Sequence, residues 1–296
     1  MRRAALAAWL VAGSVALAPV ATALAAQPEQ PGPPASLAAP PPPPPAPYKP
    51  PQAATPPHSA ASEAATYERC MSLAKTDPGA ARDLAERWQG QGGAHPADHC
   101  YAVALIGLKQ YKEGATRLET LAKAMIRAPQ SLRAEVLDQA GQAWLLAGDP
   151  ARSYAAETAA LGLLPDNAEL LLDRAEAAGA EGWYDKALAD LDRVLKADPA
   201  RVEALVYRAN AYRELGRLDE ALADIDRALA LAPHSASALL ERGDIRRLKG
   251  DLNGARQDWV KVSELAPGSD ADAEAKTNIE RLELKEEPPA PGAQRK

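Results

Sequence analysis

Four prolines stand 34 residues apart in the second half of the chain, and other residue types recur at the same interval. A glycine stands 17 residues before each proline, with a small residue on each side of it. The prolines are Pro165, Pro199, Pro233 and Pro267; the glycines are Gly148, Gly182, Gly216 and Gly250; the small residues are Gly141, Ala175, Ala209 and Gly243 before the glycine and Ser153, Ala187, Ala221 and Ala255 after it. Self-similarity at this period predicts a stack of repeated units, each packed on its neighbours.

Each period has the pattern of two helices joined by a tight turn. The glycine supplies the positive φ that a helix C-terminus often needs, and the proline ends the second helix because it cannot continue one. We call the first helix of each unit helix A and the second helix B. The chain has no Phe, 4% aromatic residues and many alanines, so helix backbones can approach closely while Leu fills the gaps. An all-α fold is predicted.

One unit shows the repeat pattern at nearly every position. The segment Leu205–Pro233, LVYRANAYRELGRLDEALADIDRALALAP, resembles the tetratricopeptide repeat family in its small, aromatic, Gly, Ala, Ala and Pro positions. The resemblance implies a right-handed α-solenoid of stacked antiparallel helix pairs, with four units at 134–167, 168–201, 202–235 and 236–269. The first of these departs from the pattern, because Pro150 occupies the usual aromatic site and Glu157 a site that is usually large and apolar.

The pattern weakens toward both ends of the repeat region. Residues 63–133 are expected to form divergent repeats of the same kind, with about six additional residues near 128–133 that break the period. After the last proline, residues 270–287 are expected to form a charged helix that caps the open end of the stack. Residues 288–296 are expected to be a disordered tail.

The first 25 residues have the layout of a secretory signal peptide: two arginines, an apolar run and small residues at Ala23 and Ala25. An uncleaved anchor helix is the alternative, which Pro19 disfavours. Residues 26–62 are rich in Pro, Ala, Gln and Ser, so we expect a disordered linker. It would be a plain tether or, alternatively, a ligand for a proline-binding domain. The expected location is the periplasm of a Gram-negative bacterium, or secretion, with no transmembrane anchor after cleavage.

The charge of the chain disfavours some partners. It carries 34 basic and 40 acidic residues, and cleavage after residue 25 would remove two arginines, leaving a net charge of −8. A net acidic chain without a basic stripe is a poor candidate for binding nucleic acid.

The two cysteines, Cys70 and Cys100, fall on expected A helices of neighbouring units, so a structural disulfide is predicted for an exported protein. Buried free thiols are the alternative. The ligand types of a metal site occur together at His95, Asp98, His99 and Cys100, but Pro96 argues against one helix presenting both histidines. Without a phosphate loop, nucleophile elbow or HExxH motif, we expect no metal, no cofactor and no enzymatic activity.

An Arg–Asp pair accompanies the last three units. The arginines on helix A are Arg174, Arg208 and Arg242, and the aspartates on helix B are Asp190, Asp224 and Asp258. The unit 134–167 has Ala140 and Ala156 at these two positions. Because the two residues are present or absent together, an ion pair within each unit is predicted. The alternative is an arginine row that binds anionic ligands.

The family resemblance implies that the A helices line a concave groove that holds a peptide or protein segment. The lining carried over from the family is Glu135, Asp138, Gln142, Glu169, Leu172, Glu176, Glu203, Val206, Asn210, Arg213, Glu214, Leu240, Asp244 and Arg247. Acids outnumber bases among them, which favours a basic or polar partner. The function expected is a non-enzymatic scaffold or adaptor. The alternatives are a periplasmic chaperone or envelope-assembly factor, and an envelope enzyme.

Overall fold

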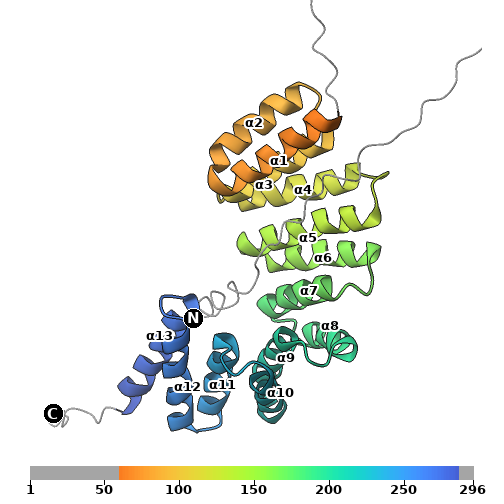
Figure 1. Ribbon diagram of the computed structural model, residues 1–296. Helices are drawn as coiled ribbons and strands as arrows, with labels where there is room; N and C mark the ends of the chain where they lie inside the picture. Colours follow the sequence, from red (N-terminus) through yellow and green to blue (C-terminus); the bar gives the residue numbers. More distant parts are fainter. Residues whose placement is uncertain (1–59, 287–296) are drawn as a thin grey trace, which may run out of the picture.

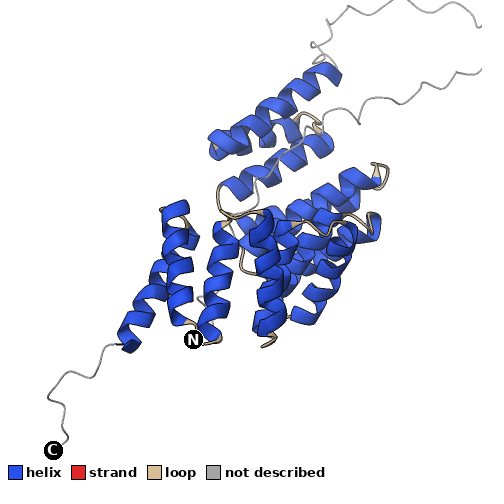
Figure 2. Ribbon diagram, turned by 60° about the horizontal axis from the view of Figure 1, so that its bottom comes forward, coloured by secondary structure: helices blue, strands red, loops and turns tan. Residues whose placement is uncertain are grey.

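The computed structural model describes residues 60–286. The expected signal peptide, the C-terminal tail and all but the last three residues of the expected linker lie outside this range. Within it, thirteen helices follow one another and no strand occurs, which confirms the all-α prediction (Figure 2). Of these helices, none is both long and apolar enough to cross a membrane.

The helices follow the repeat along the chain. They are α1 (Ala60–Thr76), α2 (Pro78–Gly90), α3 (Ala94–Gly107), α4 (Tyr111–Ala124), α5 (Gln130–Leu146), α6 (Pro150–Leu163), α7 (Ala168–Glu181), α8 (Tyr184–Ala197), α9 (Val202–Glu214), α10 (Leu218–Leu231), α11 (Ala236–Leu248), α12 (Leu252–Leu265) and α13 (Asp270–Glu286). Odd-numbered helices up to α11 are the A helices, and even-numbered ones are the B helices. The described part of the chain therefore has six helix pairs followed by one further helix.

The helix pairs stack into an arc (Figure 1). Each helix packs on the next, and successive A helices also touch: α1 contacts α3, α5 contacts α7, α7 contacts α9, and α9 contacts α11. Helices α7 and α9 lie toward the inner side of the arc, with α8 and α10 toward the outer side. The final helix, α13, packs on α12 and α11, which is the position expected of a cap.

The turns use the glycines and prolines as the sequence predicts. All four recurring glycines have positive φ, between 71° at Gly148 and 87° at Gly250. In each of the last four pairs, helix B ends two residues before its proline. Asp77 and Asp149 cap α2 and α6, where each side chain accepts a hydrogen bond from a backbone N–H and a proline follows at the first helical position.

The additional residues before the first regular unit lengthen a helix. Helix α5 has 17 residues whereas α7 has 14, and α5 begins at Gln130, about one turn earlier than the 34-residue period places it. The break in the repeat is therefore an N-terminal extension of α5.

The core is nearly continuous along the stack, and in the last three units one position of helix B contributes a large apolar side chain to it. Leu191, Ile225 and Trp259 occupy one repeat position and are at most 1% exposed. The small residue on helix A makes room for them: a Cβ atom added to Gly243 would lie 2.4 Å from Nε1 of Trp259. The small residues are thus matched in size to the side chain opposite them.

The predicted Arg–Asp pairs are present in all three units. Arg208 donates to both carboxylate oxygens of Asp224, at 2.7 and 2.8 Å, and the other two arginines hold their aspartates in the same way. Each arginine also reaches back to the preceding helix B, as in the 2.8 Å bond from Arg208 to Asp192. We call this row, formed by Arg174, Arg208 and Arg242 with their acceptors, the arginine ladder. It fixes helices within and between units.

The N-terminal pairs are joined by the predicted disulfide. Cys70 on α1 and Cys100 on α3 are bonded, with their Cα atoms 6.1 Å apart. The expectation that Pro96 prevents one helix from carrying both His95 and His99 is wrong: α3 runs from Ala94 to Gly107. Pro96 lies in its first turn, where no intrahelical N–H bond is required.

Candidate partner-binding face

The predicted lining residues belong to the A helices α5, α7, α9 and α11, and they differ in accessibility. We call the surface formed by the accessible residues of these helices the A-helix face. The exposed members are Glu169, Glu214 and Arg247; the half-buried members are Glu135, Asp138, Gln142, Glu176, Glu203, Val206, Arg213 and Asp244; the buried members are Leu172, Asn210 and Leu240. The face available to a partner is therefore narrower than the family pattern implies, and almost entirely polar.

The three buried residues do not line a surface, and their assignment to the groove is wrong. Leu172 and Leu240 are 2% and 6% exposed and belong to the continuous core. Asn210 is 8% exposed, and its amide donates to Oε2 of Glu241 at 3.2 Å. The pattern gave no information on how closely the A helices contact each other, and that contact covers these side chains.

The centre of the A-helix face is a group of three carboxylates, which we call the acidic group: Asp138, Asp173 and Glu176. Burial, followed by repulsion from Asp173 and Glu203, raises the pKa of Glu176 to about 8. Burial also raises the pKa of Asp173 and, together with a hydrogen bond to Asp173, that of Asp138 to about 9. Arg201 lies beside the group, and its Nη2 donates to Oε2 of Glu169 at 2.7 Å and to Oε2 of Glu203 at 3.2 Å.

Two residues of this face were missed by the sequence analysis. Asp173 is a member of the acidic group, and burial and then Glu176 raise the pKa of Tyr207. A polar residue recurs at their repeat position, as Gln139, Asp173, Tyr207 and Glu241. That recurrence was visible in the sequence and could have identified them.

The C-terminal part of the face contains an arginine that is already paired. Arg213 donates from Nε to Oε1 of Glu241 and from Nη1 to Oε1 of Glu214, both at 2.6 Å. Only 16% of its side chain is exposed. Burial, followed by repulsion from Glu241, raises the pKa of Asp244 to about 7. Because Arg213 is held by these acids, it does not make this part of the face a site for anions.

The acidic group has a definite chemical consequence. Burial penalises the charged form of a carboxylate, so a nearby cation both restores the charge and lowers the pKa. An ammonium or guanidinium group placed against Glu176 and Asp173 would therefore be attracted to them. Its charge would lower the pKa of these two acids, which would then lose protons.

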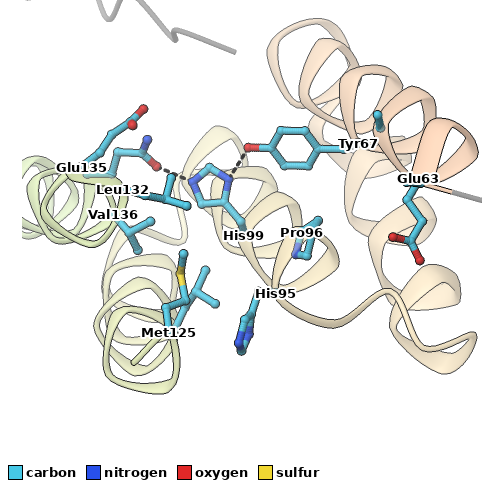
Figure 3. A pocket seen from close by; sticks show the side chains of 13 residues that line it. Glu63, Tyr67, His95, Pro96, His99, Met125, Leu132, Glu135 and Val136 are labelled. Carbon is cyan, nitrogen blue, oxygen red and sulfur yellow. Dashed lines mark hydrogen bonds between the residues drawn. The ribbon is translucent and has the colours of Figure 1, made fainter. Parts of the chain in front are cut away.

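A hollow that is open to solvent lies between α1, α3, α4 and α5 (Figure 3). Met125, Leu132 and Val136 form an apolar wall, and Tyr67 and His99 point toward each other across the opposite side. None of the lining residues is a Ser, Thr or Cys.

His99 is a structural residue in this hollow. Its Nε2 donates to Oε1 of Gln139 at 2.7 Å, so its Nδ1 accepts from the hydroxyl of Tyr67 at 2.8 Å. Burial lowers the pKa of His99, which fits this neutral form. Since Cys100 is in the disulfide and both nitrogens of His99 are used, the ligand set considered for a metal near His95 has other roles.

Comparison with known proteins agrees with this architecture. The sequence profile described as tetratricopeptide repeat matches residues 172–236 and 208–270. Among solved structures, MamA 41-end from Desulfovibrio magneticus RS-1 has a TM-score of 0.50 at 22% identity, covering 60% of this chain and 97% of that one. The thermophilic TPR protein TTC0263 of Thermus thermophilus has a TM-score of 0.51 at 21% identity, covering 63% and 99%.

No curated protein sequence matches the chain. The structural likeness, at these identities, concerns the fold, and the profile match identifies the repeats that build it. The 34-residue period, the paired helices and the profile match lead to one conclusion: residues 172–270 are tetratricopeptide repeats, and the described helices on either side continue the same fold.

Proposed function

We propose that this protein is a non-enzymatic scaffold that holds a basic segment of a partner protein against its A-helix face. The observation that supports this most directly is the acidic group around Asp173 and Glu176. Burial raises the pKa of both carboxylates, and repulsion from Asp173 raises that of Glu176 further, so both are pushed toward their neutral forms. A Lys or Arg side chain from a partner would supply the positive counter-charge that these carboxylates lack.

The rest of the face supports the same kind of partner. Glu169 and Glu214 are exposed, and Glu203 and Asp244 are half-buried, so acids continue on both sides of the centre. Arg247 is the exposed base of the predicted lining. An extended segment that crosses α7, α9 and α11 would meet mostly negative charge, which favours Lys and Arg over Asp and Glu in the partner.

The chemistry of this face favours a scaffold over the alternative of a periplasmic chaperone. A chaperone for unfolded chains needs a broad apolar surface. On the A-helix face the apolar residues Leu172 and Leu240 are buried and Val206 is half-buried, while most of the accessible positions are acidic. Selection by charge, in place of general capture of apolar segments, is the mode of binding we propose.

We also propose that the protein works after export, in the periplasm or outside the cell. The signal-peptide pattern of residues 1–25 supports this, and so does a Cys70–Cys100 disulfide, since such bonds persist mainly in oxidising compartments. Cell fractionation of the full chain and of a chain lacking residues 2–25 tests the location. Equal amounts in the cytoplasm for both chains would contradict export.

Binding is tested with fluorescent peptides of equal length in which Lys and Arg, or Asp and Glu, alternate with Ser. The basic peptide should bind, and its affinity should fall as salt increases. Glu176→Gln should weaken binding about tenfold, whereas Asp185→Asn, on the outer helix α8, should leave it unchanged. Equal binding of the acidic peptide, or an unaffected Glu176→Gln variant, would contradict the proposal.

The natural partner is sought by crosslinking in cells from a photoreactive residue at position 214 or 247. Both positions are exposed on the A-helix face. A matching residue at position 185, on α8, serves as the control. We expect a crosslinked protein from positions 214 and 247, whereas products from position 185 alone would place the partner on the outer side of the arc.

A further inference from the structure

Helix α6 buries an acid where the three later units bury a large apolar side chain. Glu157 is 0% exposed and occupies the repeat position of Leu191, Ile225 and Trp259. The fold makes room for it, because a Cβ atom at Gly141 would lie 1.9 Å from its Oε1. The carboxylate is therefore held inside the helix pair, away from solvent.

No described residue gives Glu157 a hydrogen bond. Both of its oxygens are buried and without a partner, and so is Oδ1 of Asp138. Arg174 is the nearby base, but its guanidinium is bonded to both oxygens of Asp190, at 2.8 and 2.7 Å. Burying a carboxylate without hydrogen-bond donors or a counter-charge costs folding free energy. A ligand that carries positive charge would remove that cost.

Glu157 points toward two further acids from neighbouring helices. One carboxylate oxygen each from Asp138 on α5, Glu157 on α6 and Asp173 on α7 lie within 4.8 Å of one another. Gln142 on α5 adjoins the group, with its amide 3.3 Å from Asp138 and 3.4 Å from Asp173. Three helices thus bring three carboxylates to one place, and the amide nitrogen of Gln142 donates to two of them.

This donor set selects the kind of ligand. It consists of oxygen atoms alone, without His or Cys, which is the preference of hard divalent cations. Ca²⁺ takes six to eight oxygens in flexible geometry, and carboxylates bind it through one or both oxygens. Mg²⁺ demands a near-ideal octahedron and retains water, which a site closed on one side by α6 provides poorly.

We propose that Asp138, Glu157 and Asp173 form a cation site that binds Ca²⁺ in preference to Mg²⁺. Asp138 and Asp173 are half-buried on the A-helix face, so the ion enters from the inner side of the arc. Glu157 then closes the coordination from beneath. The ion joins α5, α6 and α7 at the unit that lacks an Arg–Asp pair.

The test uses the full chain, purified, stripped with EDTA and exchanged into metal-free buffer. Calorimetric titration with CaCl₂ should give one site per chain. At Ca²⁺ concentrations about 100-fold above the Kd, the melting temperature should rise by roughly 5 °C or more, whereas equal MgCl₂ should give a much smaller rise.

Two variants assign the site. Glu157→Gln keeps the shape and should weaken Ca²⁺ binding at least tenfold. Glu157→Leu restores the residue type of Leu191, so it should melt higher than wild type without metal and show no Ca²⁺ shift. Glu181→Gln, at an exposed acid on the same helix as Asp173, is the matched control and should retain the full shift.

Three results would overturn the proposal. Wild-type protein that neither binds Ca²⁺ nor melts higher with it has no such site. A shift that survives in Glu157→Leu places the ion elsewhere. A wild-type protein that is stabilised only by lowering the pH, with no effect of Ca²⁺, holds protons in this cluster in place of a metal.

Discussion

Removing Asp224 tests how much the arginine ladder contributes to stability. This aspartate accepts two hydrogen bonds from Arg208, at 2.7 and 2.8 Å, and the two side chains are 10% and 19% exposed. A hydrogen bond to a charged group contributes about 1.5–3 kcal/mol, and removing one partner of a buried pair costs about 3–5 kcal/mol. Arg208 keeps its bond to Asp192, so we expect Asp224→Ala to lower the free energy of unfolding by about 2–3 kcal/mol.

The assay is urea denaturation followed by circular dichroism and by tryptophan fluorescence. For a folded region of this size, the expected loss corresponds to a fall in melting temperature of about 4–12 °C. Asp224→Asn keeps one acceptor oxygen and should lose about half as much. The control is Asp226→Asn on the same helix: Asp226 is 58% exposed and 3.7 Å from Arg242, so its loss should cost less than about 0.5 kcal/mol.

A double-mutant cycle separates the pair from other effects of the mutations. Arg208→Ala combined with Asp224→Ala should cost about 1–2 kcal/mol less than the sum of the two single changes. If Asp224→Ala unfolds at the same urea concentration as wild type, or if the two changes are additive, the pair has no stabilising role and the explanation of its recurrence fails.

Three further predictions concern other parts of the fold. Cys70→Ser should lower the stability by about 3 kcal/mol, since it opens a loop with a sequence separation of 30; a variant that melts like wild type, with or without reductant, would contradict this. Gly243→Ala should cost about 1–3 kcal/mol because its Cβ would meet Trp259, and an unchanged urea midpoint would count against that fit. Glu176 has a pKa of about 8 when folded, well above its unfolded value, so its contribution to stability is greatest below about pH 4 and falls as pH rises to about 8. Glu176→Gln should therefore melt higher than wild type at pH 9, and the difference in melting temperature should vanish near pH 4. The same difference at both pH values would contradict the raised pKa of Glu176.

The repeat itself made most of the fold predictable. Helix ends, positive-φ glycines and the Arg–Asp pairs all recur with the period, so each was visible several times. The covariation of Arg208 with Asp224 across units even indicated a specific contact. The sequence could not show how closely neighbouring A helices pack, and for that reason Leu172 and Asn210 were assigned to a surface from which they are excluded.

The candidate sites were less predictable because each depends on residues that break the period. Glu157 stood out as an acid at an apolar position, but its neighbours Asp138 and Asp173 come from two other helices. Only the packing of α5, α6 and α7 brings the three carboxylates together. The hollow near His99 likewise depends on the lengthened α5, whose Leu132 and Val136 form part of its wall.

The spacing of the arginine ladder also bears on how this chain can change in length. Every arginine contacts an acceptor 16 residues ahead and another 16 residues behind, in pairs such as Asp224 and Asp192. Inserting or deleting one whole 34-residue unit among the last three preserves both distances at the new junction. The number of repeat units in this half of the protein can therefore change by unequal recombination, because each new junction keeps the same arginine contacts. Ala140 marks where that freedom ends, because a copy of the unit 134–167 would interrupt the row.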